Sequence, residues 1–149
     1  MATITGTLIM EHAIFCAVFD QIERVLPDLN SIPEVRALST VVEGLLGQHA
    51  RTETDLAYAT LDHALAEKGQ LDRLHHDHKE IDSSFERVRR ASSPVEARRL
   101  LRQALAASRE HFRYEERVVF PLLERVLPGE SLQALGEASL RKHPVIAAE

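Results

Sequence analysis

The sequence predicts an all-α fold, namely an antiparallel up-down-up-down four-helix bundle with a short C-terminal fifth helical segment. Three observations support this prediction. Ala, Leu, Glu and Arg abound, whereas aromatic residues make up only 5% of the chain and Trp is absent, a composition that favours helix over sheet. Turn signals divide the 149 residues into helical lengths. Within each length, apolar residues recur at helical spacing.

The first two helices are separated by the stretch from Pro27 to Pro33. Pro27 ends the first helix, Ser31 is a candidate N-cap, and Pro33 suits the first turn of the second helix. The sequence leaves two alternatives for where the second helix ends. It either stops near Leu61 or unwinds partly between Asp62 and Gln70.

Later breaks fall at Gly69, at Ser92-Ser93-Pro94 and at Pro128-Gly129. The serines before the proline again suit a helix cap, and Pro128-Gly129 ends the fourth long helix. A short fifth segment is expected from about Ser131 to Lys142. Neither an internal repeat nor a linker is visible, so residues 1–149 are predicted to form a single domain.

Each of the four long segments carries an apolar stripe with a histidine near its centre line, at a rotation of about 100° per residue. A bundle of these segments would bring the four histidines into its core. The stripes comprise Leu8, His12, Phe15, Phe19 and Leu26; Leu38, Val42, Leu45, His49, Leu56 and Thr60; Leu71, Leu74, His78, Ile81, Phe85 and Val88; and Ala104, His111, Tyr114, Val118 and Leu122.

Two of these histidines are followed by a glutamate one turn later, in His49–Glu53 and His111–Glu115. On a helix such a pair projects in nearly one direction, with Cβ atoms roughly 6 Å apart. The two side chains can therefore hold one metal ion, or the carboxylate can bridge to a second ion. A lone pair of this kind is a weak signal, but two pairs matched by His12 and His78 form a strong one.

Four core-facing histidines and two glutamates would be costly to bury without a metal or a fully satisfied hydrogen-bond network. Imidazole and carboxylate suit iron, manganese or zinc, and the lack of thiolate ligands argues against an iron–sulfur cluster. The alternative is a metal-free helical bundle that serves as an interaction module.

The composition argues against several other classes of protein. The formal net charge is -5 with no basic block, so no nucleic-acid partner is expected. Met1 to His12 lack the pattern of a signal peptide, and no apolar run approaches the ~20 residues of a membrane helix. Cys16 is the single cysteine, which suggests a reducing, cytoplasmic location. The sequence is compatible with a homodimer but does not fix the oligomeric state.

The pattern as a whole resembles the hemerythrin-like, HHE cation-binding family. The resemblance covers about Ile9 to Leu127, and the last motif is followed by Val118-Val119-Phe120-Pro121, an apolar run and a proline that are typical of the family. The resemblance implies a four-helix bundle with two non-haem iron ions joined by an oxo or hydroxo bridge. The metal ligands that it implies are His12, His49, Glu53, His78, His111 and Glu115.

The third helix departs from the pattern of the oxygen-carrying members, which use two histidines four residues apart. Leu74 stands four residues before His78 and cannot bind a metal. His75 is rotated by about 60° from His78 and is therefore an additional candidate ligand. His76 points about 160° away and is expected in solvent.

Other residues that could bind or influence a metal are expected to lie outside the site. Tyr58 points away from His49 and Glu53 on a regular helix, unless a π-bulge intervenes. Cys16 lies one turn from His12 and is interpreted as a small buried residue. His63 is expected at the surface, and the spacing assigns no role to His143.

With single histidines on the first and third helices, the site would offer more open coordination than an oxygen carrier, which favours chemistry over simple capture. The expected ligands are peroxide, dioxygen and nitric oxide. One alternative is an enzyme, most plausibly with weak catalase-like decomposition of peroxide, for which no catalytic residue is assigned. The other is a module for reversible binding of dioxygen or nitric oxide, or for iron sensing.

Overall fold

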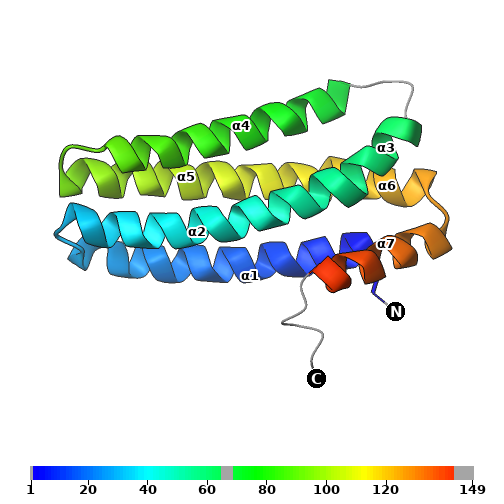
Figure 1. The fold of residues 1–149 in the computed structure, drawn as a ribbon, viewed down its shortest axis with the longest axis horizontal. Helices are drawn as coiled ribbons and strands as arrows, with labels where there is room; N and C mark the ends of the chain where they lie inside the picture. Colours follow the sequence, from blue (N-terminus) through cyan, green and yellow to red (C-terminus); the bar gives the residue numbers. More distant parts are fainter. Residues whose placement is uncertain (1, 65–68, 143–149) are drawn as a thin grey trace.

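A computed structural model of the protein describes residues 2–64 and 69–142. Within these ranges, four helices have 21 or 22 residues each: α1 (Ile4–Val25), α2 (Ile32–Thr52), α4 (Gly69–Arg90) and α5 (Pro94–Tyr114). They lie side by side with alternating direction (Figure 1), which confirms the predicted all-α bundle. None of the described helices is long and apolar enough to cross a membrane.

The helix starts follow the capping residues of the sequence. The Thr3 hydroxyl accepts a hydrogen bond from the Gly6 amide at 3.1 Å and starts α1. Ser31 and Glu34 form a reciprocal capping box at the start of α2, and Ser93 caps α5. Such caps satisfy amide groups that have no partner within the helix.

Two of the long helices continue through a short π-helical segment. After α2 come the π-helical segment η2 (Glu53–Tyr58) and α3 (Ala59–Ala64). After α5 come the π-helical segment η3 (Glu115–Val119) and α6 (Phe120–Val126). The second helix therefore extends through α3, while residues 65–68, part of the predicted unwinding, lie outside the described residues.

Two further segments complete the described fold. A 3-10 turn, η1 (Leu26–Asp28), follows α1, and α7 (Gly129–Lys142) folds back along the first half of α1 (Figure 1). The contact between α7 and the chain start is close at Gly136, where an added Cβ would lie 2.3 Å from the Ala2 carbonyl oxygen. Glycine is thus the residue that permits this approach.

The buried apolar side chains form two clusters, one on each side of a layer of buried polar residues. The buried polar residues of this layer include His12, His49, Glu53, His111 and Glu115. The first cluster contains, among others, Phe19, Leu26, Val42, Leu46, Phe85, Leu101 and Leu105. The second contains Ile4, Leu8, Leu61, Leu74, Phe120, Leu123 and Leu132 among others. Each large apolar side chain buried in this way stabilises the fold by roughly 1.5–3 kcal/mol.

The expected stripe of α2 is wrong at Leu45, whose side chain is 50% exposed, whereas Leu46 is buried. The buried positions of this helix recur at spacings of three or four residues, which is the packing pattern of neighbouring helices in a bundle. Leu45 falls at the edge of that face. The buried positions of α2 are Val35, Ser39, Val42, Leu46, His49 and Thr52.

The expected stripes also shift by one residue beyond Glu53 and beyond Glu115. A π-helical turn contains an additional residue, so every side chain after it is rotated relative to a regular helix. The sequence pattern placed Leu56, Thr60, Val118 and Leu122 in the core, whereas the structure buries Ala57, Leu61, Val119 and Leu123 more deeply.

Candidate metal centre

Six predicted side chains converge at the level of the polar layer. α1 contributes His12, α2 contributes His49, α4 contributes His78, and α5 contributes His111. The glutamates are the first residues of the π-helical segments, Glu53 in η2 and Glu115 in η3. Five of the six are buried, and the His78 side chain is 16% exposed.

These side chains form two groups of donor atoms that share both glutamates. The first group is His12, His49, Glu53 and Glu115, and the second is Glu53, His78, His111 and Glu115. Within each group one donor atom of every residue lies within 4.8 Å of the others. The arrangement therefore has the geometry of two adjacent cation positions with carboxylates between them.

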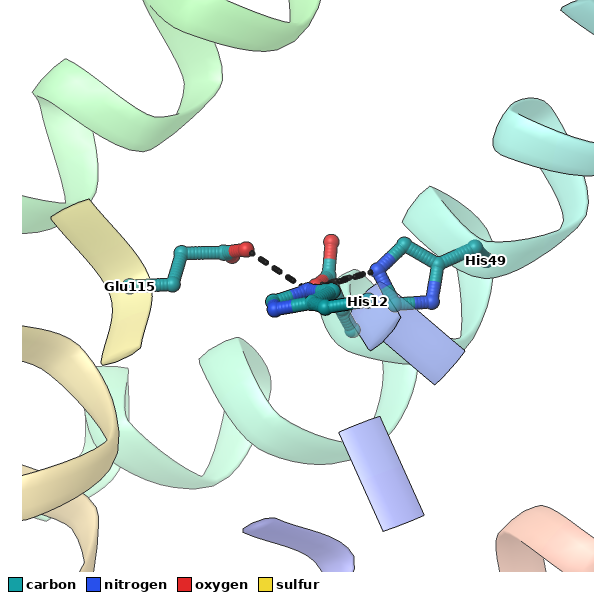
Figure 2. Close-up of side chains that lie close together, drawn as sticks. His12, His49 and Glu115 are labelled. Carbon is teal, nitrogen blue, oxygen red and sulfur yellow. Dashed lines mark hydrogen bonds and ion pairs between the residues drawn. The ribbon is translucent and has the colours of Figure 1, made fainter. Parts of the chain in front are cut away.

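The individual distances show how tightly the donor atoms meet. His49 Nε2 lies 2.8 Å from Glu53 Oε1, and His12 Nε2 lies 3.3 Å from Glu115 Oε2. His12 Nε2 also faces His49 Nε2 at 3.1 Å, and Figure 2 shows the His12 ring between Glu115 and His49. In the second group, His78 Nε2 is 3.3 Å from Glu53 Oε2.

Three further carboxylates contact the outer nitrogens of the histidines. Glu11 lies 2.6 Å from His49 Nδ1, Glu116 lies 2.9 Å from His12 Nδ1, and Asp77 lies 3.4 Å from His111 Nδ1. A carboxylate can only accept, so these Nδ1 atoms donate. The Nε2 atoms are then the ones presented to the centre, as in carboxylate–histidine–metal arrangements.

The sequence did not assign these three carboxylates, although a signal for them exists. Each of them is the sequence neighbour of a site residue but contacts a histidine of another helix. Glu11 adjoins His12 and contacts His49, Asp77 adjoins His78 and contacts His111, and Glu116 adjoins Glu115 and contacts His12. A neighbour in sequence is rotated by about 100°, which points it at the next helix of the bundle.

The electrostatics of the metal-free protein show one charged and one neutral glutamate. Burial and the adjacent charge of Glu53 raise the pKa of Glu115 well above its usual range. Burial would also raise the pKa of Glu53, but the charge of His49 and the imidazoles of His12 and His78 hold it well below that range. Two carboxylates this close cannot both be ionised without a nearby cation.

The histidines also differ in protonation. Burial would lower the pKa of His49, but Glu53 and Glu11 outweigh it and raise the pKa to about 9. Burial and the neighbouring His78 lower the pKa of His111 to about 4, despite the opposing charges of Glu53 and Asp77. Because Nδ1 of the charged His49 donates to Glu11, the second proton lies on Nε2, the atom that a metal ion would bind.

The donor set fits a metal centre because several buried polar atoms lack hydrogen bonds. Among the described residues, both Glu53 oxygens, His111 Nε2 and Glu115 Oε2 have no hydrogen-bond partner. Buried polar atoms without partners are rare and costly, and coordination to a cation would satisfy all four.

Tyr58 faces the site, which the sequence allowed only if a π-bulge intervened. Its side chain is buried, and its hydroxyl donates a short hydrogen bond to Glu115 Oε1. On a regular helix it would point away from the site, but the π-helical segment that begins at Glu53 turns it inward. Tyr58 therefore holds one of the two shared carboxylates.

The other candidates lie outside the two donor groups. His75 is exposed, with its ring centre 6.1 Å from that of Tyr58, and His76 is exposed as expected. Cys16 is only partly buried, and burial raises the pKa of its thiol. His143 and the side chain of His63 lie outside the described residues.

A groove of about 680 Å³ leads from the surface to the centre. It lies between α2 and α4 and reaches α5 at its base. Its lining includes Gly44, Gly47, Glu53, Asp82, His78 and His111. The groove therefore gives small molecules a route to the second group of donors.

We expect a metal ion that binds to the metal-free protein near neutral pH to displace protons. His49, with its pKa of about 9, and Glu115, with its raised pKa, hold protons that a metal replaces. Metal affinity should consequently weaken as the pH falls. Calorimetric titration with Zn²⁺ in buffers of different ionisation enthalpy measures this release, and a His49→Ala variant should release fewer protons. Binding without proton release would contradict the protonation assigned to both groups.

Comparison with known proteins agrees with the fold. The family model of the hemerythrin HHE cation-binding domain matches residues 3–123 and 70–143. No curated protein and no solved structure gives a significant match. A helical bundle with a buried cluster of histidines and glutamates supports a metal-binding protein of the di-iron type. The chain belongs to the hemerythrin HHE cation-binding family.

Proposed function

We propose that this chain is a non-haem di-iron protein that reacts with small oxidants, namely peroxide, dioxygen and nitric oxide. Its two irons, joined by an oxo or hydroxo bridge, would be held by the six residues of the two donor groups. The observation that carries the proposal is the sharing of Glu53 and Glu115 by both groups. Imidazole and carboxylate ligands suit iron, which the family supports.

When bound, the irons supply the electron-transfer chemistry, and the protein supplies position and surroundings. The apolar clusters on either side of the polar layer exclude bulk water. Tyr58 donates to Glu115 and fixes its carboxylate. The groove beside His78 admits small molecules.

The chain's single cysteine supports a reducing, cytoplasmic location, which stays a prediction, as does a homodimer.

Metal analysis tests the cofactor. Protein expressed with adequate iron should contain about two irons per chain, one for each donor group, with the near-ultraviolet absorption of an oxo-bridged pair. His76→Leu is the matched control, because His76 is exposed and lies outside both groups. An iron content near zero, or bound haem, would contradict the proposal.

Rapid mixing distinguishes turnover from reversible binding in the same preparation. We expect the reduced protein to be oxidised quickly by dioxygen, and the oxidised protein to consume peroxide slowly but measurably. The open groove supports this expectation, because both reactant and product can exchange through it. Uptake of dioxygen that reverses under argon would instead indicate a reversible binding or sensing module.

A further inference from the structure

The outer side of the helix pair α1 and α2 carries exposed apolar side chains. Ile14 and Val25 of α1 are 57% and 43% exposed, and Val41 and Leu45 of α2 are 62% and 50% exposed. Single exposed apolar residues are normal on a protein surface, whereas a contiguous group marks an interaction surface. The spacing and the level of these residues decide whether they form one group.

The four residues belong to a second seam on each helix, which differs from the stripe that faces the core. The seam positions are four, three and four residues apart on α1 and three, four and three apart on α2, the pattern by which helices pack against one another. Because His12 and His49 meet at one level, Leu45 lies between the levels of Ile14 and Val18. The two seams therefore form one continuous surface, which we call the outer face. It consists of Ile14, Val18, Gln21 and Val25 of α1 and of Leu38, Val41, Leu45 and Gln48 of α2.

A helix of the same chain already packs beside this face. α7 runs along the first half of α1 (Figure 1), and Nζ of its last residue, Lys142, lies 2.7 Å from the Asp55 carboxylate of η2. Asp55 follows His49 by six residues, which places it about 9 Å along the axis, on the side away from Ile14. Within the described residues, α7 therefore ends before the outer face and leaves it uncovered.

The central part of the outer face, residues 14–21 of α1 and 38–48 of α2, presents no charge among the described residues. Each of these stretches contains one charged residue, and both turn to other sides of the bundle. Asp20 pairs with an arginine of α5, and Glu43 pairs with an arginine of α4. In a chain with 28% charged residues, such a face is unusual, and burial of it requires no charge to be desolvated.

The chemistry of the face selects the kind of partner. An uncharged face argues against partners that are recognised through charge, such as nucleic acids and anionic membranes. It fits a surface that is itself apolar and uncharged, and a second copy of the chain presents such a surface of the same length. Charge complementarity at the ends favours the same partner, because Glu34 and Arg51 are exposed on either side of the α2 seam. In an antiparallel pair of copies, each Glu34 lies opposite the partner's Arg51.

We propose that two copies of this chain associate through the outer face, in an antiparallel arrangement with two-fold symmetry. The proposal concerns a surface away from the metal centre and does not depend on the di-iron function. The central part of the face is about 17 Å long and about 20 Å wide across two helices. This footprint is smaller than the ~800 Å² that each partner of a stable complex buries, so the dimer is weak and reversible, with a dissociation constant of roughly 10–100 μM.

Sedimentation velocity of the full chain, from low to high micromolar concentration, measures the association. The wild-type protein should shift from monomer to dimer over this range. Val41→Glu and Ile14→Glu each place a charge in the face of both copies, so each should weaken the dimer at least ~10-fold. Val95→Glu is the matched control, because Val95 is 67% exposed at the start of α5, outside the face, and its dimer should be unchanged. Circular dichroism checks that every variant is folded.

A charge exchange tests the antiparallel arrangement. Arg51→Glu alone and Glu34→Arg alone should each weaken the dimer several-fold, because like charges then meet at both ends. The double variant restores opposite charges and should recover most of the wild-type affinity. Recovery requires that the two residues meet across the interface, since they lie at opposite ends of the seam within one copy.

Several outcomes would overturn the proposal. A chain that stays monomeric at every concentration would do so, as would a dimer that Val41→Glu and Ile14→Glu leave intact. A chain that dimerises only after deletion of residues 143–149 would assign the face to the end of the same chain instead. Failure of the double variant to recover would overturn the antiparallel arrangement. None of these results would affect the di-iron proposal, which the iron content tests separately.

Discussion

A His49→Ala variant will lose most of its bound metal and will also be strongly destabilised when no metal is present. His49 is buried and carries the positive charge that lies 2.8 Å from Glu53 and 2.6 Å from Glu11. Its removal leaves the fully buried Glu53 without its main counter-charge. Breaking a buried ion pair on one side costs about 3–5 kcal/mol, and urea unfolding of the metal-free protein measures this loss.

His111→Ala provides the comparison, because it removes the same side chain from the other half of the centre. The lowered pKa of His111 keeps it neutral in the metal-free protein. Its removal should therefore cost less than that of His49 without metal, while metal content falls in both variants. His76→Ala should change the free energy of unfolding by no more than roughly 0.5 kcal/mol. Normal iron loading with unchanged unfolding of the His49 variant would refute the assignment.

Substitution of Gly136 by alanine will destabilise the packing of α7 on the start of α1. The new Cβ would lie 2.3 Å from the Ala2 carbonyl oxygen and 2.9 Å from the Thr3 carbonyl carbon. Because both neighbours are backbone atoms, the chain start or α7 must shift. Overpacking of this kind typically costs about 1–3 kcal/mol, which thermal unfolding measures as a loss of roughly 2–4 °C per kcal/mol.

Gly44→Ala is the matched control for this variant. Gly44 also lies within a helix, but a Cβ there meets nothing within 4 Å. Alanine has the higher helix propensity, so this variant should be more stable by roughly 0.5–1 kcal/mol. Equal effects at the two glycines would show that helix propensity, rather than contact with Ala2, decides the result at Gly136.

The sequence predicted the bundle well because its main signals are local. Ser31 and Ser93 cap the helices that they were expected to cap, since an N-cap acts on amides two or three residues away. Periodicity also placed the four histidines on the inner faces of their helices. His12 and His49 belong to different helices, and each lies on the inner face of its own helix.

The π-helical segments were not predictable in the same way. One additional residue in a turn changes the phase of everything after it, but the apolar pattern hides the change. Leu56 is followed by Ala57, and Leu122 by Leu123, so either phase offers an apolar face. The choice between the phases depends on contacts across the bundle, such as that of Tyr58 with Glu115.

The position of the polar layer between two apolar clusters has a consequence for how uniquely the chain folds. Apolar contacts have no strong direction, so leucine-rich helices can slide past one another by one turn, about 5.4 Å, at little cost. Such a slip of α1 would remove His12 from its level opposite Glu115 and would carry charged groups into an apolar cluster. The buried ion pairs therefore align the helices along the bundle axis. Metal binding and the choice of a single helix register thus act on the same residues, so ligand substitutions are expected to alter both.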